Sequence, residues 1–274
     1  IWISDALQTN VNVYPTDATG LLPGSDYKWK IRVNPDGEPN PWSDIFDFRV
    51  MGYTLDDPVS GQVLNTVSPT FSFTGPSDIA GFELQISNID DPMVESGNIF
   101  NEYIQSFPFN LPTDIPVGLL PGETYFWKVL FLDGNDNIVG EIDDYTTIES
   151  FSIEGIELNS PSQGASDLSL TPSFTWDGPI GVAQYEYSLS KDDDPSIENP
   201  IITINVPGTF YQYPQYGEYP LEYGQLYYWK IVPLDINDNR GASSEYYSFT
   251  TATNITDVVI DDINYTKPEF SLSN

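Results

Sequence analysis

Two residue types that carry much of enzyme chemistry are missing from this sequence. Its 274 residues include no cysteine and no histidine. Without cysteine the chain has no disulfide, no thiolate nucleophile and no thiolate ligand for zinc. Without histidine it lacks the usual general base near neutral pH and the commonest transition-metal ligand. Ser-His-Asp, Cys-His and HExxH catalysis are therefore excluded within this chain. Carboxylate pairs remain, but none stands in a recognisable catalytic context, so we expect no catalytic residues and no enzyme.

Positive charge and long hydrophobic segments are also scarce. Nine Lys and Arg stand against 41 Asp and Glu, which gives a formal net charge of −32. A chain this acidic repels phosphate backbones and anionic lipid head groups, so we expect no nucleic-acid partner. No run approaches the roughly 18 apolar residues that a membrane helix needs, so we expect no membrane insertion. No charged-then-apolar leader opens the sequence. The acidity favours solubility in a salty medium that screens the repulsion.

The sequence contains an internal repeat of about 100 residues. The motif Tyr-x-Trp-Lys-[Ile/Val] occurs around Trp29, Trp127 and Trp229, at separations of 98 and 102 residues. Two further motifs recur in the same order: SPTFSF (68–73) as TPSFTW (171–176), and FELQISNIDDP (82–92) as YEYSLSKDDDP (185–195). Three features in one order at one spacing establish a repeated structural unit.

Each repeat is predicted to consist of β-strands. The segments PTFSF, FELQIS, YFWKVLF and YYSFTT alternate apolar with polar or aromatic residues, and clusters of Pro, Gly, Asn and Asp separate them. No segment keeps a 3.6-residue apolar period over the length of a helix. Short strands with turn signals between them indicate an all-β protein made of antiparallel β-sandwiches.

These motifs resemble the fibronectin type III family, in particular its bacterial and archaeal surface members. The resemblance rests on Leu-Leu-Pro-Gly-x-x-Tyr-x-Trp-Lys-Val with Pro-x-Phe-x-Trp about 50 residues before it. It implies tandem fibronectin type III or immunoglobulin-like sandwiches, in which Trp176 fills the core from strand B and Phe73 takes that place one unit earlier. In the third copy, residues 222–224 read Glu-Tyr-Gly where Pro-Gly is expected. The resemblance also implies tyrosines whose hydroxyls bond the preceding turn: Tyr27, Tyr125 and Tyr227.

The repeat divides the chain into four parts. Residues 1–51 (unit 1) hold only the later strands of a domain, while 52–153 (unit 2) and 154–251 (unit 3) are complete units. Residues 252–274 read as a linker and the first strands of a further domain, with Pro268-x-Phe270 in the strand B position. No long flexible linker separates units 2 and 3, so we expect them to be closely joined.

Two interpretations of the partial ends stay open. Either the chain is a segment of a longer tandem array, or it is a filament subunit that lends strands to the next subunit by β-augmentation. Unit 2 places 50 residues between Pro69 and Leu119, whereas the tail after Pro268 and the head up to Leu21 together supply 27. About one strand and its turn are missing, which counts against strand sharing in its simplest form.

Two acidic loops, DGNDN (133–137) and DINDN (235–239), directly follow the strands that contain Trp127 and Trp229. Carboxylate and amide oxygens are the ligands that calcium prefers, and four candidates lie within five residues in each loop. The alternative is a hairpin turn, where Asn, Asp and Gly adopt positive φ and bond their own backbone. The acids of NIDDP and KDDDP are expected to be solvated turns. The candidate calcium ligands are Asp133, Asn135, Asp136, Asn137, Asp235, Asn237, Asp238 and Asn239; no other cofactor is expected.

The segment 210–229 is rich in tyrosine. Exposed rings alternating with Pro and Gly would form a platform for surface glycans or an interface to another chain. The alternative is that this segment is the strand E region and that about half of its rings fill the core. The candidate interface residues are Tyr211, Tyr213, Tyr216, Tyr219 and Tyr223.

The sequence therefore predicts a structural role outside the cell. We expect an extracellular, cell-surface building block of a microbial stalk, adhesin or filament, whose partners are neighbouring copies of itself or flanking repeats. The absence of cysteine fits many exported microbial proteins, whereas small animal ectodomains usually carry disulfides. The alternative function is a carbohydrate-binding or spacer region of a secreted polysaccharide-degrading enzyme.

Overall fold

The computed structural model describes most of units 2 and 3 and part of unit 1. The described residues are 21, 24–32, 41–50, 52–75, 81–90, 97–132, 148–191, 199–214 and 220–254. In these ranges all named elements are β-strands. No helix there is long and apolar enough to cross a membrane.

Unit 2 is a sandwich of a three-stranded and a five-stranded sheet. The smaller sheet has the order β3-β5-β8 and the larger one β4-β10-β9-β6-β7. All pairings are antiparallel except that of β4 with β10, which is parallel. The strands are β3 (Thr54–Asp57), β4 (Gln62–Leu64), β5 (Thr70–Thr74), β6 (Gly81–Ser87), β7 (Asn98–Ile104), β8 (Phe109–Asn110), β9 (Thr124–Leu132) and β10 (Glu149–Ile153).

Unit 3 repeats this topology strand for strand. Its sheets have the orders β11-β13-β16 and β12-β18-β17-β14-β15, again with one parallel pair, β12 with β18. The strands are β11 (Glu157–Ser160), β12 (Ala165–Leu168), β13 (Ser173–Asp177), β14 (Gln184–Ser190), β15 (Ile202–Val206), β16 (Phe210–Gln212), β17 (Leu226–Leu234) and β18 (Tyr247–Thr251). In strand letters, both units pair A-B-E in one sheet and A′-G-F-C-C′ in the other.

The described part of unit 1 is a two-stranded antiparallel sheet. It consists of β1 (Asp26–Trp29) and β2 (Phe46–Arg49), which occupy the places of strands F and G. Trp29 lies opposite Phe46, and their rings stack at 5.0 Å.

Aromatic side chains on alternate strand positions build the two cores. In unit 2, Phe71 of β5 meets Trp127 of β9 edge to face at 4.9 Å. In unit 3, Phe174 of β13 meets Trp229 of β17 at 5.1 Å in the same manner. All four side chains are 0% exposed. Because strand residues point alternately to the two faces, this period-2 placement packs one sheet on the other.

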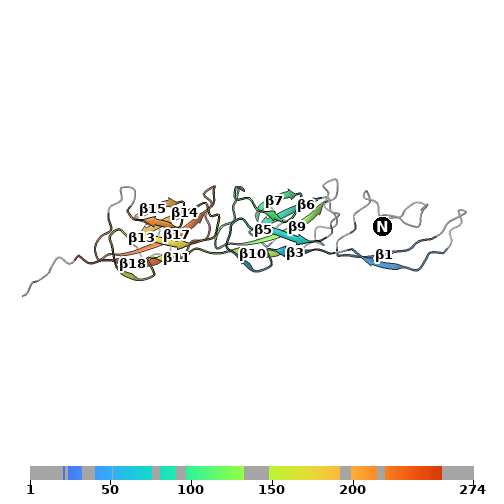
Figure 1. Cartoon of the computed structure of the whole chain (residues 1–274), viewed down its shortest axis with the longest axis horizontal. Helices are drawn as coiled ribbons and strands as arrows, with labels where there is room; N and C mark the ends of the chain where they lie inside the picture. The colour runs from blue at the N-terminus through green and yellow to red at the C-terminus, as the bar shows by residue number, and fades with distance from the viewer. Residues whose placement is uncertain are drawn as a thin grey trace, which may run out of the picture.

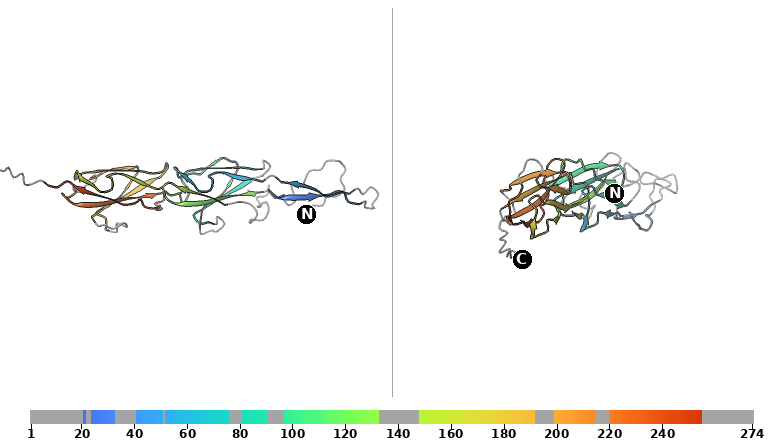
Figure 2. Two further views of the ribbon diagram at one scale, coloured as in Figure 1. Left: turned by 90° about the horizontal axis from the view of Figure 1, so that it is seen from below. Right: turned by 60° about the vertical axis from the view of Figure 1, so that its left-hand side comes forward.

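The units stand in a row (Figure 1). Unit 3 lies at one end, unit 2 in the middle and the β1–β2 sheet at the other end, and the view from below keeps this order (Figure 2). The strands of both complete sandwiches run roughly along the row.

The prediction of tandem fibronectin type III-like β-sandwiches is confirmed by this strand order. Trp176 is 1% exposed and fills the core of unit 3, as the resemblance implies. Phe73 occupies the equivalent position, since Leu55 pairs with Phe73 as Leu158 pairs with Trp176. Phe73 is half-buried and packs against the core of unit 2.

Candidate functional site: the junction between the sandwiches

Units 2 and 3 are joined by a short linker and by hydrogen bonds between their backbones. Only residues 154–156 separate β10 from β11. The loop after β4 and the loop after β13 form a parallel bridge between Thr66 and Ile180. The Val67 N–H donates to the Ile180 carbonyl at 3.0 Å, and the Ile180 N–H donates to the Asn65 carbonyl at 3.2 Å. Units 2 and 3 are thus linked by main-chain hydrogen bonds that depend on no particular side chain.

The loop Asp235–Asn239 of unit 3 supplies the carboxylate at the centre of this junction. Asp235 is 7% exposed. Its Oδ2 accepts the N–H of Gly118 in unit 2 at 3.0 Å and the Asn239 side-chain amide at 2.7 Å. Its Oδ1 accepts the N–H groups of Asn237 and Asn239, both at 2.8 Å. One carboxylate therefore orders its own loop and bonds the neighbouring sandwich.

The two asparagines of the loop extend the contact to unit 2. The Asn237 side-chain amide donates to the Pro116 carbonyl at 3.1 Å, and the Asn239 amide donates to the same carbonyl at 3.5 Å. The Pro116 carbonyl and the Gly118 N–H thus both find partners on the next unit. Gly118 is buried, and a buried N–H without a partner is costly, so its bond to Asp235 favours one fixed arrangement of the two units.

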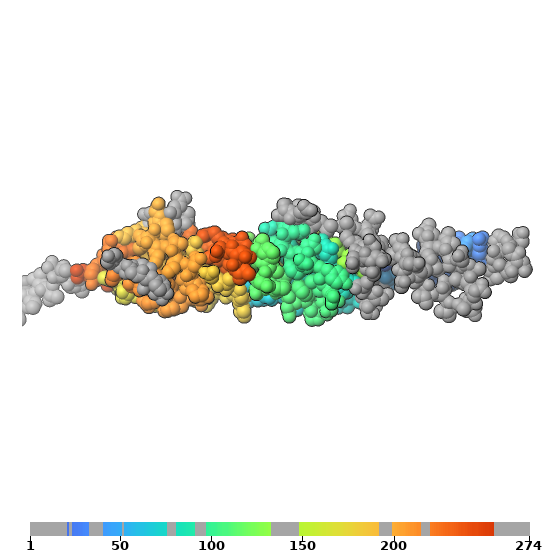
Figure 3. Space-filling view, turned by 90° about the horizontal axis from the view of Figure 1, so that it is seen from above, coloured from blue at the N-terminus to red at the C-terminus, as the bar shows by residue number. Residues whose placement is uncertain are grey.

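Close packing surrounds these polar contacts. A Cβ atom added to Gly122 would lie 2.8 Å from the Cβ of Ala242, and one added to Gly241 would lie 3.0 Å from the Cβ of Leu120. Val182 packs against the cores of both units. In the space-filling view the red end of unit 3 lies directly against the green surface of unit 2 (Figure 3). Larger side chains at the two glycines would push the sandwiches apart.

A buried tyrosine fixes the turn of unit 2 that carries this contact. The Tyr125 hydroxyl accepts the N–H of Leu120 at 2.8 Å, and Tyr125 is 2% exposed. Burial raises the pKa of Tyr125 well above its ordinary value, although the hydrogen bond from Leu120 opposes this. The hydroxyl therefore stays protonated and holds the turn next to Gly118 in place.

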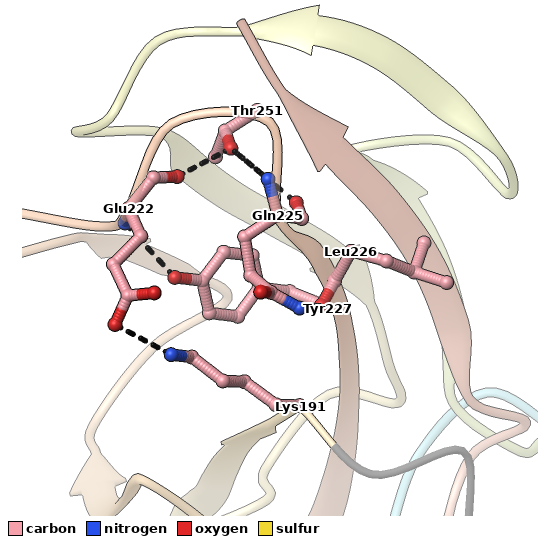
Figure 4. A network of polar contacts seen from close by, with 6 residues as sticks. All are labelled: Lys191, Glu222, Gln225, Leu226, Tyr227 and Thr251. Atoms are coloured by element: carbon pink, nitrogen blue, oxygen red, sulfur yellow. Dashed lines mark hydrogen bonds and ion pairs between the residues drawn. The ribbon is translucent and has the colours of Figure 1, made fainter. Parts of the chain in front are cut away.

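The same tyrosine bond recurs in unit 3, within a larger polar network (Figure 4). The Tyr227 hydroxyl accepts the Glu222 N–H at 2.9 Å, and the Thr251 hydroxyl donates to the Glu222 carbonyl at 2.6 Å. The Lys191 ammonium bonds the Glu222 carboxylate at 2.6 Å, which raises the pKa of Lys191. The tyrosine bonds that the resemblance implied are confirmed for Tyr125 and Tyr227. For Tyr27 the equivalent turn includes residues 22–23, which lie outside the described residues.

The Asp235 carboxylate gives the junction a predicted dependence on pH. Burial alone would raise its pKa, but the bonds from Asn239, Gly118 and Asn237 outweigh burial, so the pKa falls below its ordinary value of 3.8. A group with a lowered folded-state pKa contributes stability above the unfolded-state pKa and loses it as the pH falls through the folded-state value. We expect the stability difference between the wild type and Asp235→Asn to be full at pH 7 and to shrink towards zero below pH 3.8. Melting curves of both proteins across this range test it, and a difference that is constant with pH would contradict it.

The predicted calcium ligands fall into two groups. Asp133, Asn135, Asp136 and Asn137 lie outside the described residues. In unit 3 the hairpin-turn alternative is observed, with Asp238 at φ 62° and the Asp238 N–H bonded to the Asp235 carbonyl at 3.2 Å. Each Asp235 oxygen already accepts two N–H groups, as described above, and no cluster of three or more Asp or Glu suited to a metal occurs within the described ranges. Calcium binding at these loops stays a prediction.

The tyrosine-rich segment divides between core and surface. Tyr211 is 2% and Tyr213 5% exposed, and both belong to the core of unit 3. The core alternative therefore holds for these two rings, and a surface role for them is wrong. β16 pairs with β13, and the Tyr213 N–H continues this pairing by bonding the Pro172 carbonyl at 3.0 Å. Tyr223 is 55% exposed. Tyr216 and Tyr219 lie outside the described residues.

Sequence reasoning missed the residues that make the junction. Gly118 and Pro116 contribute backbone groups, which leave no residue-type signal. The one available signal was the loop DINDN, whose polar residues were assigned to calcium or to a turn rather than to a neighbouring unit.

Comparisons with known proteins find similar solved structures but no matching family model or curated protein. No family model matches the sequence, and no curated protein matches it. Among solved structures it is similar to the fibronectin(III)-like modules of Clostridium thermocellum CbhA, at 11% identity and a TM-score of 0.25 over 73% of this chain and 94% of that one. It is also similar to chicken CNTN1 FN1-FN3 domains, at 13% identity and a TM-score of 0.27 over 85% of this chain and 80% of that one.

Proposed function

We propose that this chain is a structural spacer, a building block of a stalk, adhesin or filament on a microbial cell surface. The observation that carries the proposal is the junction: a linker of three residues, a backbone bridge and the Asp235 carboxylate bond two sandwiches in line. Such a junction resists bending, because bending would break hydrogen bonds to buried backbone groups. A row of sandwiches held this way spans distance.

The composition supports the same role. A net charge of −32 makes protein molecules repel one another at low salt and keeps them soluble. At high salt this repulsion is screened. Absence of histidine and cysteine removes the commonest general base and the thiolate nucleophile. Neighbouring copies of the chain or flanking repeats are the proposed partners.

The carbohydrate-binding alternative loses part of its support. It required a row of exposed tyrosines, but Tyr211 and Tyr213 are core residues, and Tyr223 is the exposed ring among the described members of the set. Among the described tyrosines of this segment, one exposed ring is a weak platform for a sugar chain. We therefore favour the spacer.

Labelling of intact cells tests the proposed location. An antibody raised against unit 3 is expected to stain intact cells of the native host without permeabilisation, and brief protease treatment of those cells is expected to remove the signal. Staining that requires lysis of the cells would overturn the surface role, and a known cytoplasmic protein serves as the control for cell integrity.

A further inference from the structure

The β1–β2 sheet has one charged face and one aromatic face. On the charged face Lys28 bonds Asp47 at 2.8 Å, and Arg49 bonds Asp26 at 3.1 Å. The opposite face carries the aromatic residues of the same strands. Among them Trp29 is 46%, Phe46 49% and Phe48 41% exposed. This is a contiguous aromatic surface on a folded hairpin.

The same face is fully buried in the other two units of the chain. Trp127 and Phe151 of unit 2, and Trp229 and Phe249 of unit 3, are all 0% exposed. They match Trp29 and Phe48 by register, because Tyr27 pairs with Phe48 as Tyr125 pairs with Phe151 and Tyr227 with Phe249. Units 2 and 3 therefore each show which residues cover this face in a complete sandwich.

In both units a phenylalanine from strand B contacts both of these aromatic rings. Phe71 contacts Trp127 at 4.9 Å and Phe151 at 5.9 Å. Phe174 contacts Trp229 at 5.1 Å and Phe249 at 5.7 Å. Each of these phenylalanines stands in the pattern Pro-x-Phe-[Ser/Thr]-[Phe/Trp], at 69–73 and at 172–176.

A third copy of this pattern stands near the end of the sequence. Residues 268–272 read Pro-Glu-Phe-Ser-Leu, with Phe270 in the place of Phe71 and Phe174. The segment 255–274 lies outside the described residues, and it follows directly on the end of unit 3 that is remote from β1 and β2.

The tail of the same molecule is too short to reach the aromatic face. If residues 268–274 lie across that face, residues 255–267 span at most about 45 Å at about 3.5 Å per residue. The two sandwiches in between contain strands of nine residues, β9 and β17, that run along the row. At about 3.3 Å per residue, the two together occupy about 60 Å.

We propose that the aromatic face of the β1–β2 sheet binds the segment Pro268–Asn274 of a second copy of this chain, with Phe270 packed on Trp29 and Phe48. The inference rests on the proposed structural role, and it identifies the binding partner as a second copy of the chain. The acceptor lies before unit 2 and the donor lies after unit 3, so the contact is head to tail. A head-to-tail contact between identical subunits repeats without closing and generates a filament.

The mass of the purified chain in solution tests this proposal. By light scattering after size exclusion, the 274-residue chain is expected to form species of increasing mass as its concentration rises. A chain that ends at residue 254 keeps every described residue and is expected to stay monomeric. Phe270→Ser alters only the tail and is expected to weaken association about a hundredfold, as for loss of one buried aromatic ring. Phe210→Ser is the matched control, because Phe210 is 55% exposed on unit 3 and has no part in the contact.

Complementation separates head-to-tail binding from other contacts. The truncated chain is an acceptor without a donor, and full-length Phe48→Ser is a donor with a damaged acceptor. Mixed together, they are expected to form a complex of one copy of each and nothing larger. A monomeric wild type, association of the truncated chain alone, or association that survives Phe270→Ser would each overturn the proposal. Such results would leave the cell-surface labelling unaffected, so failure of this inference is distinct from failure of the spacer role.

Discussion

Replacing Trp229 by alanine is expected to remove most of the stability of unit 3. Trp229 is 0% exposed and lies against Phe174, Tyr187 and Tyr247. Truncation of a buried tryptophan to alanine costs about 3–5 kcal/mol, because it removes apolar contact and leaves a cavity. A domain of this size is stable by about 5–15 kcal/mol in total. The melting temperature of unit 3 is expected to fall by about 15 °C or more.

Calorimetry measures this effect, and Trp42→Ala supplies the control. Trp42 is 47% exposed, and its ring faces Lys30 and Arg32 at 4.7 Å on the surface of unit 1. Its replacement is expected to change the stability of unit 3 by less than about 0.5 kcal/mol. If Trp229→Ala lowered the melting temperature no more than Trp42→Ala does, the assigned core of unit 3 would be wrong.

Replacing Asp235 by alanine is expected to uncouple the two sandwiches. The change leaves the Gly118 N–H, two loop N–H groups and the Asn239 amide without the acceptor that they share. Loss of a buried acceptor of this kind costs about 2–4 kcal/mol. Part of this cost falls on the loop of unit 3 and part on the contact with unit 2. We expect the junction to become a hinge while both sandwiches remain folded.

The calorimetric trace reports this uncoupling. In the wild type, unfolding of units 2 and 3 is expected to overlap because each stabilises the other across the junction. In Asp235→Ala two separate transitions are expected, the earlier one from unit 3. Asp177→Ala, which removes an exposed carboxylate from the same unit, is expected to behave as the wild type. Identical traces for Asp235→Ala and Asp177→Ala would contradict a role of Asp235 in the junction.

The sandwich fold was predictable because its signals are local and repeated. Strands such as β9 and β17 alternate inward aromatics over several residues, and Tyr125 and Tyr227 stand at a fixed distance after a turn. Period-2 alternation decides which face a strand buries, and Trp127 and Trp229, which marked the repeat in the sequence, are both 0% exposed. The core position of Trp176 was implied by the family resemblance. The parallel pairing of β4 with β10 and of β12 with β18 was not predicted, because these short strands have three and four residues and no clear alternation.

The junction was not predictable in the same way. Its backbone bridge at Thr66 and Ile180 involves main-chain groups that any sequence carries. Asp235 was noticed as an acid in a polar loop, but nothing in the loop itself reveals that Gly118, 117 positions earlier, supplies a hydrogen-bond donor. Tyr211 and Tyr213 show a different limit: the sequence left a surface role and a core role open for this segment. Pairing of β16 with β13, continued by the bond from the Tyr213 N–H to the Pro172 carbonyl, places both rings in the core.

A distance distribution between units 2 and 3 tests the proposed stiffness most directly. Because the chain has no cysteine, spin labels can be attached at two introduced cysteines alone. Glu102→Cys on β7 and Asn205→Cys on β15 are exposed positions on equivalent strands of the two units. Pulsed electron paramagnetic resonance is expected to give one narrow distance in the wild-type background and a broad distribution when Asp235→Ala is added. A broad distribution in the wild-type background would show that the sandwiches move independently, and a stiff spacer would then be the wrong description of this protein.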